Sequence, residues 1–136
     1  MSRSLFLLLA GIYSSLLAVV MVFATKAALN NYGVPTVDVT HISVMQFLGV
    51  ATGAFGLLSL LNRNAPNSFS LRTILLAQGY VSLAGVVLGI YHVYVLHVPF
   101  SAFFVGDTLF RLALGLAFVY FYNRETKLAG AGTVLA

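Results

Sequence analysis

The residue with the clearest chemical potential in this sequence is His92, an ionisable side chain inside a long apolar run. Polar and small residues recur through residues 78–97 at steps of 4, 3, 4 and 3, which places them on one face of an α-helix. This stripe consists of Gln78, Ser82, Gly85, Gly89 and His92. Ionisable groups in membrane helices are costly and face the bundle interior or a water-filled cavity. His92 is therefore either an interfacial histidine with its polar edge among the lipid headgroups, or a group in an outer-leaflet pocket that binds a ligand or handles protons.

Three further polar side chains are expected close to His92. Tyr91 and Tyr94 lie on the same segment, and Gln46 of the preceding apolar run is expected at about the same depth. These residues complete a candidate ligand site. For Gln46, Gln78 and Ser82 we expect a packing role ahead of ligand binding, because polar residues of this kind join membrane helices by hydrogen bonds.

Histidines also suggest a redox cofactor. A bis-histidine haem needs two imidazoles at matching depth on different helices, and His41 with His92 is the pair to test. His92 would lie about 6 Å deeper than His41 by the helical rise, so the match in depth is poor. A quinone- or haem-binding redox anchor using His92 and His41 is thus one alternative function.

A metal site is not expected. His41, His97 and Asp38 or Asp107 have the right ligand types for zinc, but their spacing follows no standard zinc pattern.

Asp107 and Arg111 form a second candidate site. Their i,i+4 spacing allows an ion pair on one helix face, and Asp107 after Gly106 reads as a helix N-cap. Pairing lowers the cost of keeping Arg111 inside an apolar run. The alternative to this structural role is a site for an anion or a lipid headgroup, as in a small transporter or lipid-handling protein.

Several classes of function are excluded by what the sequence lacks. The chain contains no cysteine, so disulfides, thiolate catalysis and iron–sulfur clusters are ruled out. It has no serine-nucleophile motif, phosphate-binding glycine loop or HExxH motif. The basic residues are scattered singly, so no nucleic-acid partner is expected. These absences favour a non-enzymatic protein over an enzyme.

The elements that must position these residues are membrane helices. Of the 136 residues, 60% are hydrophobic and only 7% are charged, whereas about 25% are charged in a typical soluble domain. Four apolar runs match the ~30 Å hydrocarbon core. We predict an all-α bundle of four transmembrane helices, with neighbours antiparallel, at about residues 5–24, 41–61, 71–97 and 107–123.

One membrane domain, residues 1–124, is expected to precede a flexible cytoplasmic tail, residues 125–136. Between the last two spans, residues 98–106 are expected to form an aromatic loop in the membrane interface.

Charge predicts the orientation. With the N-terminus in the cytoplasm, five basic residues lie inside and two outside, which favours both termini inside by the positive-inside rule. The inner residues are Arg3, Arg63, Arg72, Arg124 and Lys127, and the outer ones are Lys26 and Arg111. All three histidines and two of the three acids then gather on the outer side. We place the protein in a bacterial cytoplasmic membrane.

Small residues predict how the helices pack. Close backbone approach holds membrane helices together. The second run offers Gly49, Gly53 and Gly56, and the third offers Ser82, Gly85 and Gly89. A short loop joins these two runs, so we expect the two stripes to face each other.

The chain resembles the small bacterial four-helix membrane proteins called DoxX-like. The resemblance lies in LFLLLAGIY, MQFLGVATGAFGLLSLLNR and RLALGLAFVYFY, which open or fill three of the four predicted helices. It implies the four-helix fold. DoxX-like proteins have been linked to quinone-associated or redox complexes, but no residue motif in this chain carries that function over.

The predicted function follows from an apolar surface with few reactive groups. We expect a non-catalytic accessory or structural subunit of a larger membrane complex, or a homo-oligomer, in contact with membrane lipid. No cofactor is the first expectation, and haem or quinone is the alternative.

Overall fold

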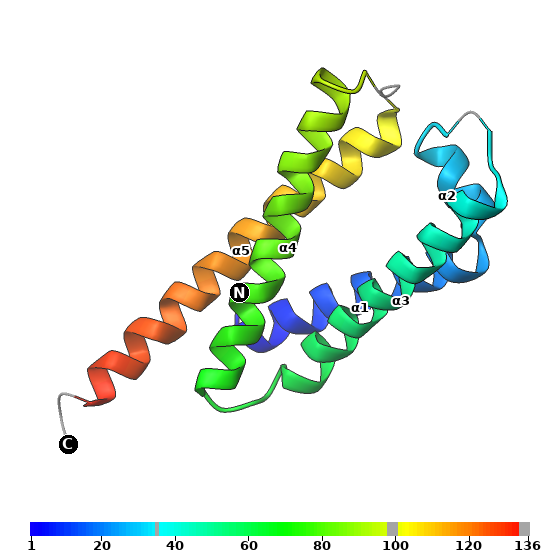
Figure 1. Cartoon of the computed structure of the whole chain (residues 1–136). Helices are drawn as coiled ribbons and strands as arrows, with labels where there is room; N and C mark the ends of the chain where they lie inside the picture. The colour runs from blue at the N-terminus through cyan, green and yellow to red at the C-terminus, as the bar shows by residue number, and fades with distance from the viewer. Residues whose placement is uncertain (35, 98–100, 134–136) are drawn as a thin grey trace.

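The structure is a computed structural model that describes residues 1–34, 36–97 and 101–133. This part of the chain is helical, without strands. Four of its helices are long and apolar enough to cross a membrane, so the protein is a small helical membrane protein (Figure 1). The helices are α1 (Arg3–Phe23), α2 (Thr25–Asn31), α3 (Val39–Asn62), α4 (Phe69–Tyr94) and α5 (Ala102–Thr133).

Three of the long helices begin at a side-chain cap. Ser2, Asp38 and Ser68 each accept a hydrogen bond from the backbone N–H three residues later, at the start of α1, α3 and α4 respectively. Such caps satisfy N–H groups that the helix itself leaves without a partner. They explain why these three helices begin within two residues of the predicted positions.

Helix α3 packs against α1. Gly49, Gly53 and Gly56 were predicted to face α4, but all three lie against α1. A Cβ added to Gly56 would lie 2.6 Å from Oγ of Ser15, and one added to Gly49 would lie 2.9 Å from Cβ of Met21. The prediction of the partner was therefore wrong. A stripe of small residues indicates close approach to some helix, and a short loop does not decide which helix that is.

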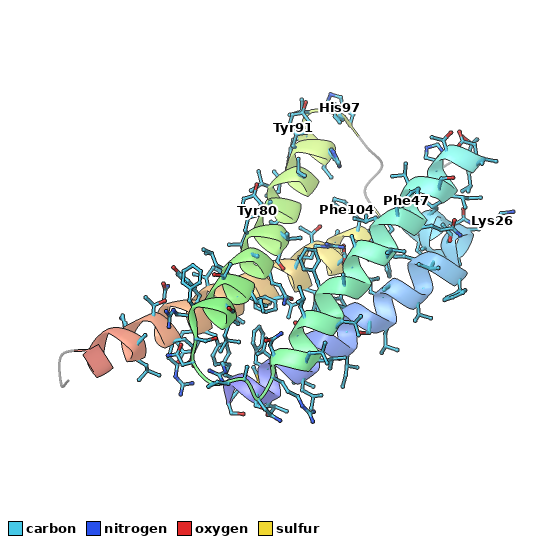
Figure 2. The ribbon with its side chains drawn as sticks, turned by 60° about the horizontal axis from the view of Figure 1, so that its bottom comes forward. Lys26, Phe47, Tyr80, Tyr91, His97 and Phe104 are labelled. Atoms are coloured by element: carbon cyan, nitrogen blue, oxygen red, sulfur yellow. The ribbon has the colours of Figure 1, made fainter. Side chains whose placement is uncertain are left out.

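Helix α4 packs against α5. A Cβ added to Gly89 would lie 3.1 Å from the ring of Phe104, and one added to Gly115 would lie 3.2 Å from Cβ of Ser82. Gly85 faces α5 as well. Phe104, near the start of α5, lies against α4 at Gly89 and lines the cavity between the two helix pairs (Figure 2). The stripe on α4 is thus a packing seam, but against α5.

Two helix boundaries differ from prediction. α5 begins at Ala102 and stays helical through Thr133, whereas the sequence suggested a helix over residues 107–123 and a flexible tail. Glu125, placed in that tail, is 5% exposed. The expected interfacial loop is helical from Ala102 to Gly106, and residues 98–100 and 134–136 lie outside the described part of the chain.

A short helix that the sequence did not predict, α2, lies directly after α1. Thr25 continues the chain into α2 and anchors the turn, since its Oγ1 donates to the carbonyl of Met21 at 2.7 Å. α2 ends at Asn31 with Tyr32 as its C-cap, and Gly33 takes the left-handed φ of 85° that the chain needs to turn away. Tyr32 is thereby held beside the start of α5.

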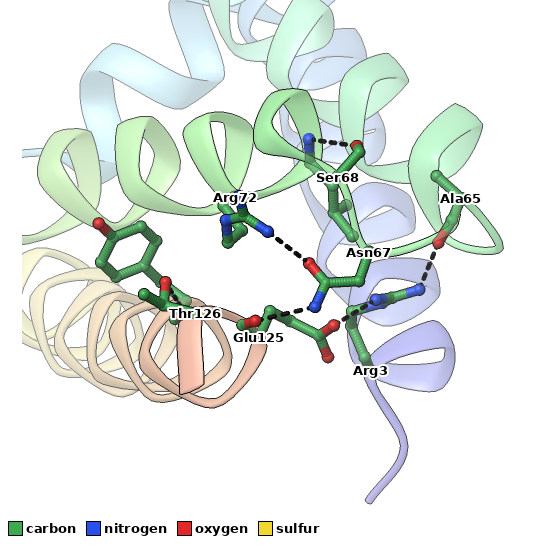
Figure 3. Close-up of polar contacts among 9 residues, drawn as sticks. Arg3, Ala65, Asn67, Ser68, Arg72, Glu125 and Thr126 are labelled. Carbon is green, nitrogen blue, oxygen red and sulfur yellow. Dashed lines mark hydrogen bonds and ion pairs between the residues drawn. The ribbon is translucent and has the colours of Figure 1, made fainter. Parts of the chain in front are cut away.

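The two helix pairs meet at the end where the N-terminus lies. An apolar cluster joins them there, consisting of Phe6, Leu7, Ala10, Leu71, Leu75, Phe118 and Phe121. Below it, Arg3 Nη1 donates to Oε2 of Glu125 at 2.8 Å, and Arg3 also donates to the carbonyl of Ala65 (Figure 3). Asn67 Nδ2 donates to the backbone carbonyl of Glu125 at 2.8 Å. We call this the closed end.

From the loop that joins them, α3 and α4 diverge (Figure 1). A buried side-chain bond links them near the closed end, where Ser59 Oγ donates to Oε1 of Gln78 at 3.0 Å. Toward the other end, cavities lie between the pairs, and the candidate site lies among them.

Candidate functional site

The carboxylate of Asp107 lies at the centre of a polar cluster built from three helical segments. Arg111 Nε donates to Oδ2 of Asp107 at 2.7 Å. Tyr32 donates its hydroxyl to the same oxygen at 3.0 Å, and Tyr13 donates to Oδ1 at 3.2 Å. We call Tyr13, Tyr32, Asp107 and Arg111 the polar cluster. It ties α1 and the end of α2 to α5.

The sequence anticipated one half of this cluster. The predicted i,i+4 ion pair between Asp107 and Arg111 is present. The predicted N-cap role of Asp107 is wrong, because α5 begins five residues earlier at Ala102 and Asp107 lies inside the helix. Its carboxylate is therefore satisfied by side chains and not by the end of a helix.

The two tyrosines were missed. Tyr13 is 94 residues and Tyr32 is 75 residues from Asp107 along the chain, so no spacing links them to it. One signal was available. A tyrosine hydroxyl in the middle of an apolar span needs a partner, and Tyr13 lies in the middle of α1.

Burial and charge act together on the cluster. The side chain of Asp107 is 10% exposed and that of Arg111 is 31% exposed. Removal from water and, to a smaller extent, the nearby Asp107 carboxylate raise the pKa of Tyr32 from 10.0 to about 12. The Tyr32 phenol therefore stays protonated and serves as a hydrogen-bond donor at neutral pH.

Two apolar cavities flank the cluster. The first, which we call the α4 cavity, has a volume of about 500 Å³ and lies between α3, α4 and α5. The second, the α2 cavity, has a volume of about 600 Å³ and lies between α1, α2 and α5. Tyr32 and Asp107 line both. The polar cluster thus separates two spaces, each large enough for part of a lipid-sized molecule.

His92 lines the α4 cavity together with Arg111 and Tyr80. This places the most reactive residue of the predicted stripe beside the polar cluster. Tyr91 and Tyr94 are not among the residues that line this cavity, and both are exposed. Tyr91 lies at the far end of α4 (Figure 2).

Gln46 does not join His92 either. It is exposed on α3, and its Nε2 donates to the backbone carbonyl of Val22 on α1 at 3.1 Å. This is the interhelical role that was the alternative to ligand binding. The reason is the pairing of α3 with α1, which turns Gln46 away from α4.

His41 lies at the start of α3, where its backbone N–H and its ring Nδ1 both lie 2.8 Å from Oδ1 of Asp38. The backbone bond lowers the pKa of the Asp38 carboxyl. His41 does not line the α4 cavity that contains His92, so the structure does not bring together the pair considered for haem.

The described residues contain no group of three or more His, Cys, Asp or Glu side chains that could hold a metal ion. The chemistry that the site offers is therefore that of hydrogen-bond donors and one ion pair beside apolar cavities.

Comparison with known proteins finds no family model, no curated protein and no solved structure that matches the chain. The resemblance to DoxX-like proteins stays a prediction. Inferences about function rest on the polar cluster and on the cavities beside it.

Proposed function

We propose that this membrane protein handles lipids, and that it binds an amphiphile that enters the α4 cavity sideways from the bilayer. The observation that carries the proposal is the position of the polar cluster between two apolar cavities, among helices long enough to span a membrane. An apolar tail fits the cavity walls and a polar headgroup fits the cluster.

Arg111 is the residue that would recognise the headgroup. Its bond to Asp107 uses Nε, so the terminal amino groups are not taken by that bond. The side chain lies against α4 at Gly85, where an added Cβ would be in ordinary van der Waals contact with Nη1 of Arg111, at 3.8 Å. A guanidinium binds carboxylate and phosphate oxygens well, since its N–H groups match their geometry.

The ion pair with Asp107 lowers the free-energy cost of placing the Arg111 guanidinium in an apolar environment. A lone arginine inside a spanning segment is costly, and a paired one less so. The cluster therefore offers donors to a ligand without carrying a full unpaired charge. His92, also on the cavity wall, adds a second polar contact.

The test measures binding of an anionic lipid by purified protein in detergent or nanodiscs. Arg111→Gln should weaken the affinity by about tenfold or more, since loss of a charge-assisted bond is worth about 1.5–3 kcal/mol. Arg124→Gln, an exposed arginine on the same helix, is the matched control and should bind as the wild type does. Equal affinity of wild type and Arg111→Gln would refute the proposal.

We also propose that both termini lie in the cytoplasm of a bacterial cell. The support is the five-to-two distribution of basic residues, together with an even number of candidate spans. Membership in a larger complex as an accessory subunit stays a prediction, and co-purification from native membranes followed by mass spectrometry would test it.

A further inference from the structure

A third cavity lies deeper in the molecule, at about the middle of the spans. It has a volume of about 60 Å³ and lies where α1, α3, α4 and α5 meet. We call it the central cavity. Six of its eleven lining residues are polar: Tyr13, Ser14, Thr52, Gln78, Ser82 and Arg111. A polar interior surface at this depth requires a partner, because lipid supplies none.

Gln78 carries an unpaired donor into this space. Its side chain is 5% exposed, and its Oε1 accepts the bond from Ser59. Its Nε2 has no acceptor among the described residues. A buried amide without a partner costs about 1–3 kcal/mol. The two N–H groups of Nε2 therefore fit a molecule that brings an acceptor.

Arg111 connects the central cavity with the α4 cavity, because it lines both. A headgroup held at the guanidinium from the α4 side can therefore reach Gln78. Thr52 donates its hydroxyl to the carbonyl of Leu48 and Tyr13 donates to Asp107, so Gln78 and Arg111 are the two nitrogen donors of the lining that argue for an acceptor ligand.

The size of the central cavity restricts which part of a ligand it can hold. At about 60 Å³ it is far smaller than the α4 cavity of about 500 Å³, so it suits a small headgroup and not a hydrocarbon chain. A carboxylate is a compact acceptor headgroup, with two oxygens on a single carbon. A phosphate ester is bulkier and brings more oxygens that need donors once they are buried.

We propose that the central cavity is a carboxylate subsite, and that the amphiphile is a long-chain carboxylic acid bound as its anion. The carboxylate accepts from Arg111 and from Nε2 of Gln78, while the chain lies in the α4 cavity. This inference rests on the proposed function and narrows its ligand class.

The experiment compares oleate with oleyl phosphate, which share a hydrocarbon chain and differ in the headgroup. Binding of each probe is measured for purified full-length protein at a pH where both are ionised. Wild type should bind oleate about tenfold more tightly than oleyl phosphate, a difference of about 1.4 kcal/mol. Gln78→Met keeps the length of the side chain, removes the amide and should abolish this preference.

Two further variants test whether the preference for oleate depends on the central cavity. Gln46→Met alters an interhelical glutamine outside the central cavity and should keep the preference. Ser14→Val fills the central cavity while leaving the bond between Ser59 and Gln78 in place, and it should lose the preference. It serves also if Gln78→Met fails to fold.

The outcomes separate this inference from the proposed function. One result would overturn the carboxylate subsite and leave the lipid-handling proposal standing. In that result wild type binds both probes equally, Gln78→Met and Ser14→Val bind as wild type does, and Arg111→Gln binds more weakly. A central cavity that holds only water would give this result. Binding of neither probe to wild type would overturn the subsite, and failure of other anionic lipids as well would overturn both.

Discussion

Asp107 shows how an acidic residue is kept inside an apolar helix. Three donors from different segments converge on its two oxygens, at distances between 2.7 and 3.2 Å. Each donor would be costly to bury alone, and so would the carboxylate. Together they satisfy one another, and the same residues become a fixed polar wall between two apolar cavities.

The tyrosine hydroxyls should therefore contribute measurably to stability. Tyr32→Phe and Tyr13→Phe each remove one bond to a carboxylate and keep the ring, so each should lower the free energy of unfolding by about 1–2 kcal/mol. Thermal unfolding in detergent measures the loss. Tyr120→Phe, 60% exposed on α5, is the control and should change little. Equal stability of all three variants would show that the cluster does not hold the helices together.

Tyr32 also makes stability depend on alkaline pH. Its pKa rises from 10.0 to about 12 on folding, so the folded state favours the neutral phenol. The stabilisation is fully present below pH 10 and is lost as the pH rises through about 12. A difference titration of tyrosinate absorbance between wild type and Tyr32→Phe should show a group that ionises near pH 12. Ionisation of Tyr32 near pH 10 would contradict this assignment.

At this scale the sequence predicted local pairs and missed distant ones. The bond between Asp107 and Arg111 follows from helical spacing and was predictable. Tyr13 and Tyr32 reach Asp107 only through tertiary packing, which no local pattern encodes. His92 was singled out because an ionisable group in an apolar run is conspicuous. Its expected neighbours do not line its cavity: Tyr91 and Tyr94 were inferred from nearness in sequence, and Gln46 from depth.

Among the helices, glycines determine how closely α1 and α3 approach. The space that a Cβ would need at Gly56 is already taken by the backbone nitrogen of Ser15 at 3.0 Å and the carbonyl oxygen of Gly11 at 3.1 Å. Backbone atoms cannot move aside as a flexible side chain can. The contact is therefore specific for glycine, and the stripe was correctly read as a packing surface although its partner was predicted wrongly.

Substitutions at two glycines should act in opposite directions. Gly56→Ala forces α1 and α3 apart and should destabilise the protein by about 1–3 kcal/mol. Gly106→Ala, with nothing within 4 Å of the added Cβ, should stabilise α5 by about 0.5–1 kcal/mol. Unfolding in detergent followed by circular dichroism compares the two. A neutral Gly56→Ala variant would mean that α1 and α3 are not in close contact.

The length of α5 could not be predicted from the sequence. Charged and small residues after Tyr122 suggest a tail, because they lack apolar periodicity. Glu125 nevertheless lies in a helix, since Arg3 and Asn67 bind it at the closed end. Tertiary partners thus extend a helix beyond the point where its own sequence stops indicating one.

The whole molecule combines a closed end with a set of cavities between diverging helices. Apolar packing and the contacts of Arg3 fasten one end, and the polar cluster bridges α1 and α2 to α5 farther along. The number of spans and the helical class were predictable, because length and hydropathy report them directly. The cavities were not, since they arise from which helices pair and where the pairs separate.

Orientation in the membrane is a prediction at this scale. Reporter tags in the loop at residue 66 and at the C-terminus should both report the cytoplasm, because five of the seven basic residues then lie inside. A tag inserted after Gly33 should report the opposite side and serves as the internal control. A periplasmic signal at residue 66 would show that the orientation is the reverse of the predicted one, with the polar cluster in the cytoplasmic half of the membrane.

The ion pair between Arg3 and Glu125 should hold the closed end together. The two side chains are 18% and 6% exposed. They lie 122 residues apart in the sequence and join α1 to α5. Arg3→Met leaves the carboxylate buried without its partner and should destabilise the protein by on the order of 3 kcal/mol, as removing one partner of a buried pair does. Glu125→Gln keeps a polar group facing Arg3 and should cost less.

The double variant, Arg3→Met with Glu125→Leu, tests whether the pair acts through charge or only through position. It replaces both charges by apolar groups, so it should recover much of the stability that Arg3→Met loses. Chemical unfolding of wild type, Arg3→Met, Glu125→Leu and the double variant in detergent gives the coupling energy from the double-mutant cycle. Strictly additive losses would show that the two residues do not interact, and the closed end would then depend on the apolar cluster around Phe6, Phe118 and Phe121 alone.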